Sequence, residues 1–273
     1  MKDIIVVRGA GDLATGVAYR LKRSGFRVLM LEIETPLVIR RTVSYAQAIY
    51  DGEIEIQGIT GRKVEDLDEI VKAWKNDEIP VIIDEKGEMI KTIRPKIVVD
   101  AILAKKNLGT TIDMADIVIG LGPGFTAGVD CDAVIETKRG HYLGTVITEG
   151  PAIADTGIPG NIAGFSKERV IHSPAEGIIK HKSKISDVVE KGQVIAEVDG
   201  VPVKATIDGV LRGLIHEGLH VEKGLKIADI DPRDVQKHCF SISDKARAIG
   251  GGVLEAILYF KNKEEMEEDE SQA

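Results

Sequence analysis

Residues 4–14 read IIVVRGAGDLA, a short run of β-branched residues that ends in two glycines and the beginning of a helical pattern. From Leu13 to Arg23 the apolar residues recur at helical spacing, and Ser24-Gly25 then interrupts the pattern. A second apolar run, from Phe26 to Leu31, follows directly. Strand, glycine turn, helix and strand in this order predict a β-α-β unit of the length expected for a mononucleotide-binding half.

The glycine turn fits a dinucleotide-binding fingerprint, with Gly9, Gly11 and Ala14 at the G-x-G-x-x-A positions. Such glycines let backbone N–H groups approach a pyrophosphate at the N-terminus of a helix. Glu32 follows 21 residues after Gly11, near the place where an acid holds a ribose hydroxyl. Asp12 complicates this interpretation, because its charge favours the helix dipole but repels a phosphate. Either the turn binds a nucleotide, or its glycines serve only packing.

Two adjacent arginines, Arg40 and Arg41, follow the second predicted strand. They could bind a phosphate through two parallel hydrogen bonds, or form a solvated pair beside a loop. No catalytic order of nucleophile, base and acid stands out in the chain, so the sequence leaves open whether the protein is an enzyme. Cys131 fits a buried core position better than a reactive thiol.

A longer glycine loop begins at Gly120, after the apolar run from Ile117 to Ile119. Ligands of open α/β sheets bind at the carboxyl ends of the strands. The glycines of this loop are therefore candidates for ligand contact, namely Gly120, Gly122 and Gly124. Pro123 removes one N–H donor and the lysine of a P-loop is absent, so the loop is not a P-loop.

Composition narrows the class of protein. The chain has 273 residues and a formal net charge of −8, which argues against nucleic-acid binding, as does an aromatic content of 4%. No apolar run approaches the roughly 20 residues that span a bilayer, and no signal-peptide pattern is found at the start. The two cysteines form no metal-binding pair. We therefore expect a cytoplasmic protein without a structural metal and with no membrane partner.

An internal repeat with an offset of 32 residues follows the first two-thirds of the chain. Val189-Glu-Lys-Gly192 returns as Val221-Glu-Lys-Gly224, and Ile195-Ala-Glu-Val198 returns as Ile227-Ala-Asp-Ile230. Two copies of a short β-rich unit are expected to pair around a shared core. The pattern resembles the biotinyl/lipoyl domain, in which the hairpin between the halves carries a modified lysine. The hairpin from Val198 to Pro202 has no lysine at its tip, so the resemblance implies an unmodified barrel.

Four segments together with the repeat resemble the YqeB-type proteins of the selenium-dependent molybdenum hydroxylase system: GAGDLATG, VIRRTVSYAQAIYDG, VIGLGPGFTAG and KRGHYLGTVI. The resemblance extends to about Phe260. Its first part is similar to the C-terminal domain of XdhC-type factors, which handle the molybdenum cofactor before it enters a hydroxylase. The resemblance implies an accessory or maturation factor, with a molybdenum hydroxylase or other maturation proteins as partners.

The expected fold class is α/β. Residues 1–167 are expected to form a Rossmann-like parallel sheet domain, and residues 168–231 an all-β lipoyl/biotinyl-like barrel-sandwich domain. Residues 232–260 carry an apolar stripe that needs a core, so we expect a helical segment that packs back on the first domain. Residues 261–273 are acidic and polar, which is typical of a disordered tail.

The predicted function is binding of a small phosphate-bearing ligand, either the molybdenum cofactor or a dinucleotide such as NAD(P). One alternative is an NAD(P)-dependent oxidoreductase, favoured by Gly9, Gly11 and Glu32 but without an obvious acid/base pair. The other is a non-catalytic binding or scaffold module, favoured by the repeat. A homo-oligomer is compatible with the sequence.

Overall fold

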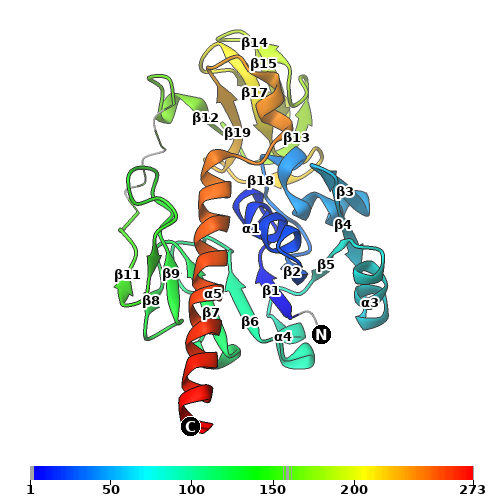
Figure 1. Ribbon diagram of the computed structural model, residues 1–273. Helices are drawn as coiled ribbons and strands as arrows, with labels where there is room; N and C mark the ends of the chain where they lie inside the picture. Colours follow the sequence, from blue (N-terminus) through cyan, green and yellow to red (C-terminus); the bar gives the residue numbers. More distant parts are fainter. Residues whose placement is uncertain (1–2, 156, 158–159, 161, 273) are drawn as a thin grey trace.

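The computed structural model describes residues 3–155, 157, 160 and 162–272, with side chains as far as residue 263. Within this part of the chain, one nine-stranded sheet has the order β10-β9-β7-β6-β1-β2-β5-β4-β3 (Figure 1). Neighbouring strands from β9 to β4 are parallel, whereas β10 and β3 are antiparallel to their neighbours. The strands are β1 (Ile4–Arg8), β2 (Arg27–Glu32), β3 (Glu53–Ile56), β4 (Ile59–Val64), β5 (Ile79–Ile83), β6 (Ile97–Asp100), β7 (Ile117–Leu121), β9 (Ala133–Ile135) and β10 (Val146–Ile147).

Helices cover both faces of this sheet. Alternation along β1 explains why both faces are apolar: Ile5 and Val7 join the core on one face, and Val6 joins the core on the other. The helices α1 (Asp12–Arg23) and α5 (Asp244–Gln272) pack on the Ile5 face, and α3 (Leu67–Lys75) on the Val6 face. The shorter helical elements are η1 (Arg41–Val43), η2 (Tyr45–Gln47), α2 (Ala48–Asp51), α4 (Glu88–Ile93), η3 (Ile112–Met114), η4 (Lys167–Arg169) and η5 (Gln236–Phe240).

The C-terminal helix α5 lies beside α1, and glycines allow the close approach. A Cβ at Gly16 would lie 2.6 Å from the Cβ of Ala246, and a Cβ at Gly250 would lie 2.8 Å from the oxygen of Gly16. Figure 1 shows α5, in orange and red, running the length of the sheet. The helix continues through residues 261–272, for which composition predicts disorder.

The remaining strands form small antiparallel sheets. Two four-stranded sheets have the orders β12-β19-β17-β14 and β16-β15-β13-β18, and a two-stranded sheet pairs β11 with β8. The repeat is visible in the strands: β13 and β17 begin 32 residues apart, at Gly177 and Gly209, which have φ values of +145° and +146°. The strands are β8 (Thr126–Ala127), β11 (Gly150–Pro151), β12 (Val170–His172), β13 (Gly177–His181), β14 (Val188–Val189), β15 (Val194–Val198), β16 (Val201–Lys204), β17 (Gly209–Leu214), β18 (His220–Val221) and β19 (Lys226–Asp231).

The predicted fold class is wrong beyond α/β. The large sheet is mixed rather than parallel, because β3 and β4 are joined by only Gln57 and Gly58, both with positive φ, and so short a connection permits only antiparallel pairing. The repeat region is not a separate lipoyl-like barrel. Its two sheets enclose a core that also packs against Ile39, and the N–H of Leu214 donates to the Ile39 carbonyl at 2.8 Å. Patterns within the repeat could not reveal this contact with a distant segment.

Among the described residues, no helix combines the length and the apolar character needed to cross a membrane.

Candidate functional site

A cleft of about 1910 Å³ lies at the carboxyl ends of the parallel strands β1, β2, β6 and β7. One wall comes from the ends of these strands and the loops that follow them. The opposite wall comes from the antiparallel region, through Arg169, Arg212 and Lys226, and the N-terminus of α5 adds Lys245. The cleft is therefore built from both parts of the chain, at the edge of the sheet where ligands of α/β proteins bind.

The glycine turn predicted from the sequence lines this cleft. The backbone conformation requires glycine at position 9 but not at position 11. Gly9 has φ +94°, its N–H donates to the Leu31 carbonyl at 2.7 Å, and a Cβ would lie 3.0 Å from the oxygen of Ala101. Gly11 has an ordinary φ of −67°, and a Cβ there would meet only Val38, at 3.6 Å. The fold requires glycine at position 9. At position 11 the missing side chain leaves open space in the cleft.

The carboxylate of Glu32 stabilises this turn through hydrogen bonds. Its Oε2 accepts a hydrogen bond from the N–H of Ala10 at 2.8 Å, and its Oε1 accepts one from the N–H of Ile33 at 2.9 Å. Burial raises the pKa of the Glu32 carboxyl, although both backbone hydrogen bonds oppose that shift. The carboxylate lines the cleft with both oxygens already engaged. Any ribose hydroxyl would have to share them.

Asp12 and Arg40 form an ion pair at the start of α1. The Arg40 Nη1 lies 2.9 Å from Asp12 Oδ2, and Arg40 is only 5% exposed. Its Nη2 also donates to the carbonyls of His238 and Ser241, at 3.0 and 3.2 Å. This pairing reduces the repulsion that Asp12 alone would exert on an anion. It also means that Arg40 connects α1 to the segment that leads into α5.

The neighbouring Arg41 contacts the antiparallel region instead of α1. Its Nε donates to the Leu214 carbonyl at 2.7 Å, and burial lowers the pKa of its guanidinium. Unlike Arg40, it is not among the described residues that line the cleft. The two adjacent arginines are thus separated by the structure, and neither is an unpaired cation beside the glycine turn.

The glycines of the second loop serve packing. A Cβ at Gly120 would lie 2.5 Å from the Phe125 ring, Gly122 has φ +75° and faces the Thr137 side chain, and a Cβ at Gly124 would lie 2.7 Å from the backbone nitrogen of Lys106. The loop reaches the cleft through other residues, Leu121 and Pro123. The sequence therefore located a cleft-lining loop, but not the residues in it that face a ligand.

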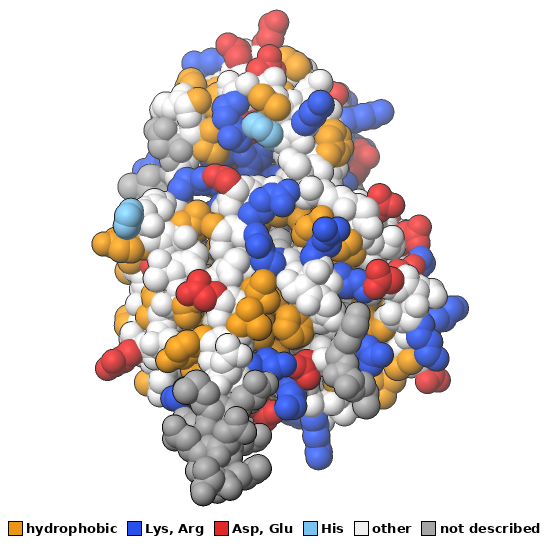
Figure 2. Space-filling view, in the orientation of Figure 1, with side chains coloured by type: hydrophobic (Ala, Val, Ile, Leu, Met, Phe, Trp, Pro, Cys, Tyr) orange, Lys and Arg blue, Asp and Glu red, His pale blue; other side chains and the backbone are white. Residues whose placement is uncertain are grey.

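Cations outnumber acids along the described cleft lining, by eleven Lys and Arg to six Asp and Glu, although the whole chain carries a net charge of −8. Figure 2 shows Lys and Arg side chains gathered across the middle of the molecule, between the nine-stranded sheet and the antiparallel region. The cationic residues are Arg8, Arg40, Lys86, Lys105, Lys138, Arg139, Lys167, Arg169, Arg212, Lys226 and Lys245. This excess favours an anionic ligand.

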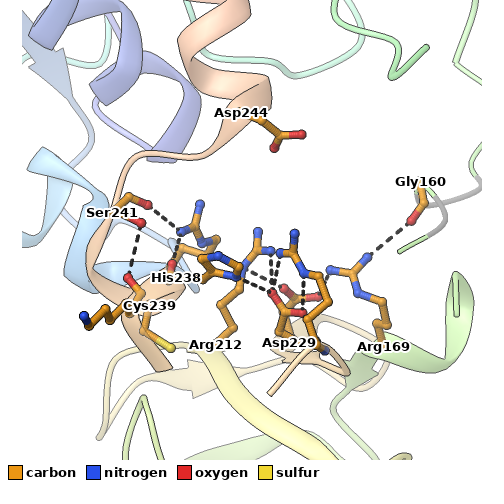
Figure 3. A network of polar contacts seen from close by, with 12 residues as sticks. Gly160, Arg169, Arg212, Asp229, His238, Cys239, Ser241 and Asp244 are labelled. Atoms are coloured by element: carbon orange, nitrogen blue, oxygen red, sulfur yellow. Dashed lines mark hydrogen bonds and ion pairs between the residues drawn. The ribbon is translucent and has the colours of Figure 1, made fainter. Parts of the chain in front are cut away.

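A buried network of ion pairs holds the second wall (Figure 3). Arg169 lies 2.7 Å from Asp229, and Arg212 lies 3.5 Å from Asp229 and 3.3 Å from Asp231. Arg233 completes the network at 2.6 Å from Asp231. Burial acts to raise the pKa of Asp231, but the hydrogen bonds and charge of Arg233, together with Arg212, hold it well below its usual value.

Apolar side chains line another part of the cleft. Ile33, Leu37 and Leu108 are 36%, 47% and 46% exposed, and Ile102 lies on the same lining. Solvent-exposed apolar side chains within a concave site offer a surface for a flat apolar group of a ligand. The described residues contain no cluster of three or more His, Cys, Asp or Glu side chains suited to a metal ion.

Fold and site thus define an α/β protein with a large, cation-rich cleft at the carboxyl ends of its parallel strands. The sequence is 52% identical over 256 residues to the uncharacterized protein YqeB of Escherichia coli (strain K12), which supports the YqeB-type resemblance. The match covers 94% of this chain and 47% of YqeB, so the chain spans about half the length of that relative. No model of a known protein family matches the sequence.

Weak likenesses to solved structures were also found. An aspartoacylase family protein from Mesorhizobium loti has a TM-score of 0.28 and 10% identity, over 84% of this chain and 85% of that chain. A succinylglutamate desuccinylase from a Silicibacter species has a TM-score of 0.26 and 10% identity, over 84% of each chain. Likenesses at this level assign no activity to this chain.

Proposed function

We propose that the chain binds a phosphate-bearing small molecule in the cleft and acts as an accessory factor for a molybdenum hydroxylase. The observation that carries the binding proposal is the excess of cations in a cleft of about 1910 Å³ beside Gly11, where a Cβ would meet only Val38. Backbone N–H groups at the start of α1 add donors suited to a phosphate. The apolar lining at Ile33, Leu37 and Leu108 suits a flat ring system.

The molybdenum part of the proposal rests on the YqeB-type resemblance. Molybdopterin and its dinucleotide form carry phosphate and a flat ring system, and the cleft offers both cations and apolar surface for them. The ligand would pass to, or be modified for, a selenium-dependent hydroxylase, with that enzyme or another maturation protein as partner. The alternative, an NAD(P)-dependent oxidoreductase, is favoured by Gly9, Gly11 and Glu32. It is weakened by the engagement of both Glu32 oxygens with backbone N–H groups.

The test is Gly11→Val, because an ordinary φ at Gly11 tolerates a side chain that would fill the open space. Titration calorimetry with molybdopterin dinucleotide and with NADP(H) should show at least a tenfold loss of affinity, about 1.4 kcal/mol or more. Gly251→Ala is the matched control, since a Cβ there meets nothing within 4 Å and Gly251 does not line the cleft. Equal affinity in both variants would refute a ligand over Gly11. The preferred nucleotide separates the two candidate functions.

A further inference from the structure

The side chains of four arginines in the cleft lining are nearly buried: Arg8, Arg40, Arg169 and Arg212. In Arg8 and Arg40, both terminal nitrogens, Nη1 and Nη2, donate hydrogen bonds. Arg212 differs from them, because its side chain is only 11% exposed and yet its contacts are long. Its Nη1 lies 3.3 Å from Asp231 and its Nε lies 3.5 Å from Asp229, and its Nη2 has no partner among the described residues.

Arg169 lies beside Arg212, because both contact the same carboxylate. The Nη2 of Arg169 lies 2.7 Å from Asp229 Oδ1, and Arg212 approaches Asp229 Oδ2 (Figure 3). The Arg169 side chain is 7% exposed, and its Nε has no hydrogen-bond partner within the part of the chain that the structure describes. Asp229 therefore holds two guanidinium groups of the cleft lining one carboxylate apart. We call Arg169 and Arg212 the arginine pair.

The ion-pair network that contains the arginine pair has more cations than acids. Arg169, Arg212 and Arg233 contact only two carboxylates, those of Asp229 and Asp231. Arg233 engages both oxygens of Asp231, at 2.9 and 2.6 Å, which leaves Arg212 with the longest contacts between an arginine and an acid in the network. A nearly buried guanidinium with an unbonded nitrogen is unfavourable, and an oxyanion at the arginine pair would remove that cost.

Two direct contacts connect the arginine pair to the start of α1. Gly213, the residue after Arg212, lies against the segment that follows β2: a Cβ there would lie 3.0 Å from the Ile39 oxygen and 3.4 Å from the Cγ of Arg40. Arg40 in turn pairs with Asp12 at 2.9 Å. The arginine pair and the glycine turn therefore belong to one continuous part of the cleft, which a single ligand can span.

We propose that Arg169 and Arg212 form a second anion-binding subsite of the cleft, which takes a phosphate or carboxylate group of the ligand. A planar guanidinium presents paired N–H donors that match both kinds of oxyanion. This inference rests on the proposed function. It adds that the ligand carries two separated anionic groups, one over Gly11 and one at the arginine pair. The antiparallel region then takes part in binding, through η4 and β17.

Titration calorimetry of the full chain with inorganic phosphate, and separately with acetate, tests the subsite. Arg212→Gln removes the charge and the unbonded nitrogen, so it should weaken binding of the preferred anion at least tenfold. The same change in a Gly11→Val chain separates this subsite from binding over the glycine turn. Arg62→Gln is the matched control and should leave affinity unchanged, because Arg62 pairs with Glu78 and neither is among the described residues that line the cleft.

Asp229→Asn gives a readout that a purely structural network would not show. It removes the acid between the two arginines, so anions should bind at least threefold more tightly, and this gain should shrink as the salt concentration rises. A gain in affinity cannot be mistaken for a loss of folding. Glu78→Gln is the control, because it removes a carboxylate that is paired with an arginine outside the cleft lining. Unchanged or weaker anion binding by Asp229→Asn would overturn the inference.

The remaining outcomes separate this inference from the proposed function. If Arg212→Gln binds phosphate and acetate as tightly as Arg62→Gln, the subsite is wrong. If Gly11→Val loses dinucleotide binding while Arg212→Gln keeps it and binds both anions normally, the proposed function stands and this inference alone fails. If the unmodified chain binds neither phosphate nor acetate, the inference fails, and the dinucleotide titrations decide the proposed function. A loss confined to phosphate or to acetate supports the subsite and identifies the group that it takes.

Discussion

Replacement of Arg40 by methionine tests whether this arginine holds the fold or binds the ligand. The buried guanidinium makes three hydrogen bonds, to Asp12 and to the carbonyls of His238 and Ser241. Arg40→Met removes all three and leaves Asp12 without its cation. The segment between η5 and α5 would lose its connection to the start of α1.

The expected cost follows from this geometry. Hydrogen bonds that involve a charged group contribute about 1.5–3 kcal/mol each, and removing one partner of a buried ion pair costs about 3–5 kcal/mol. The side chain of Asp12 is 26% exposed, so water can partly replace the lost cation. We therefore expect a decrease of about 3 kcal/mol in the free energy of unfolding, at the lower end of that range.

Urea denaturation followed by circular dichroism measures this change. Lys91→Met is the control, because Lys91 pairs with Glu88 at an exposed site of α4 and should change stability by less than about 0.5 kcal/mol. A cost below about 1 kcal/mol for Arg40→Met, together with a tenfold loss of nucleotide affinity, would refute the structural role. Arg40 would then be the phosphate-binding cation that the sequence suggests.

Two further predictions concern packing and pH. Gly16→Leu should lower the free energy of unfolding by about 3 kcal/mol, measured by thermal denaturation, because its Cβ would overlap Ala246. The control Gly251→Ala should raise the free energy of unfolding by up to about 1 kcal/mol, because a Cβ there meets nothing within 4 Å. Similar losses in both variants would contradict the α1–α5 contact. Asp231→Asn should destabilise the fold at neutral pH and do so less in acid. The ion pair with Arg233 depresses the pKa of Asp231 in the folded chain. The stabilisation by the ionised carboxylate is therefore fully present above the unfolded-chain pKa of about 3.9, and it is lost as the pH falls toward the folded pKa. Urea denaturation at pH 7 and pH 3 checks this, and a pH-independent difference from wild type would contradict it.

Local elements could be predicted from the sequence because their signals are local. The apolar run from Ile4 to Val7 corresponds to β1 (Ile4–Arg8), and the helical spacing from Leu13 to Arg23 corresponds to α1 (Asp12–Arg23). The fold class could not be predicted in the same way. Strand direction in β3 depends on the two-residue connection to β4, and the sheet order depends on pairings between strands far apart in sequence.

The residues of the candidate site likewise divide into those found from local patterns and those that depend on contacts between distant segments. A glycine turn after a strand is a local pattern, so Gly9, Gly11 and Glu32 could be found, and all three line the cleft. The pairing of Asp12 with Arg40 could not be found, because it depends on how the chain returns to α1 after β2. A charge judged in sequence as repelling a phosphate is offset by a neighbour 28 positions away.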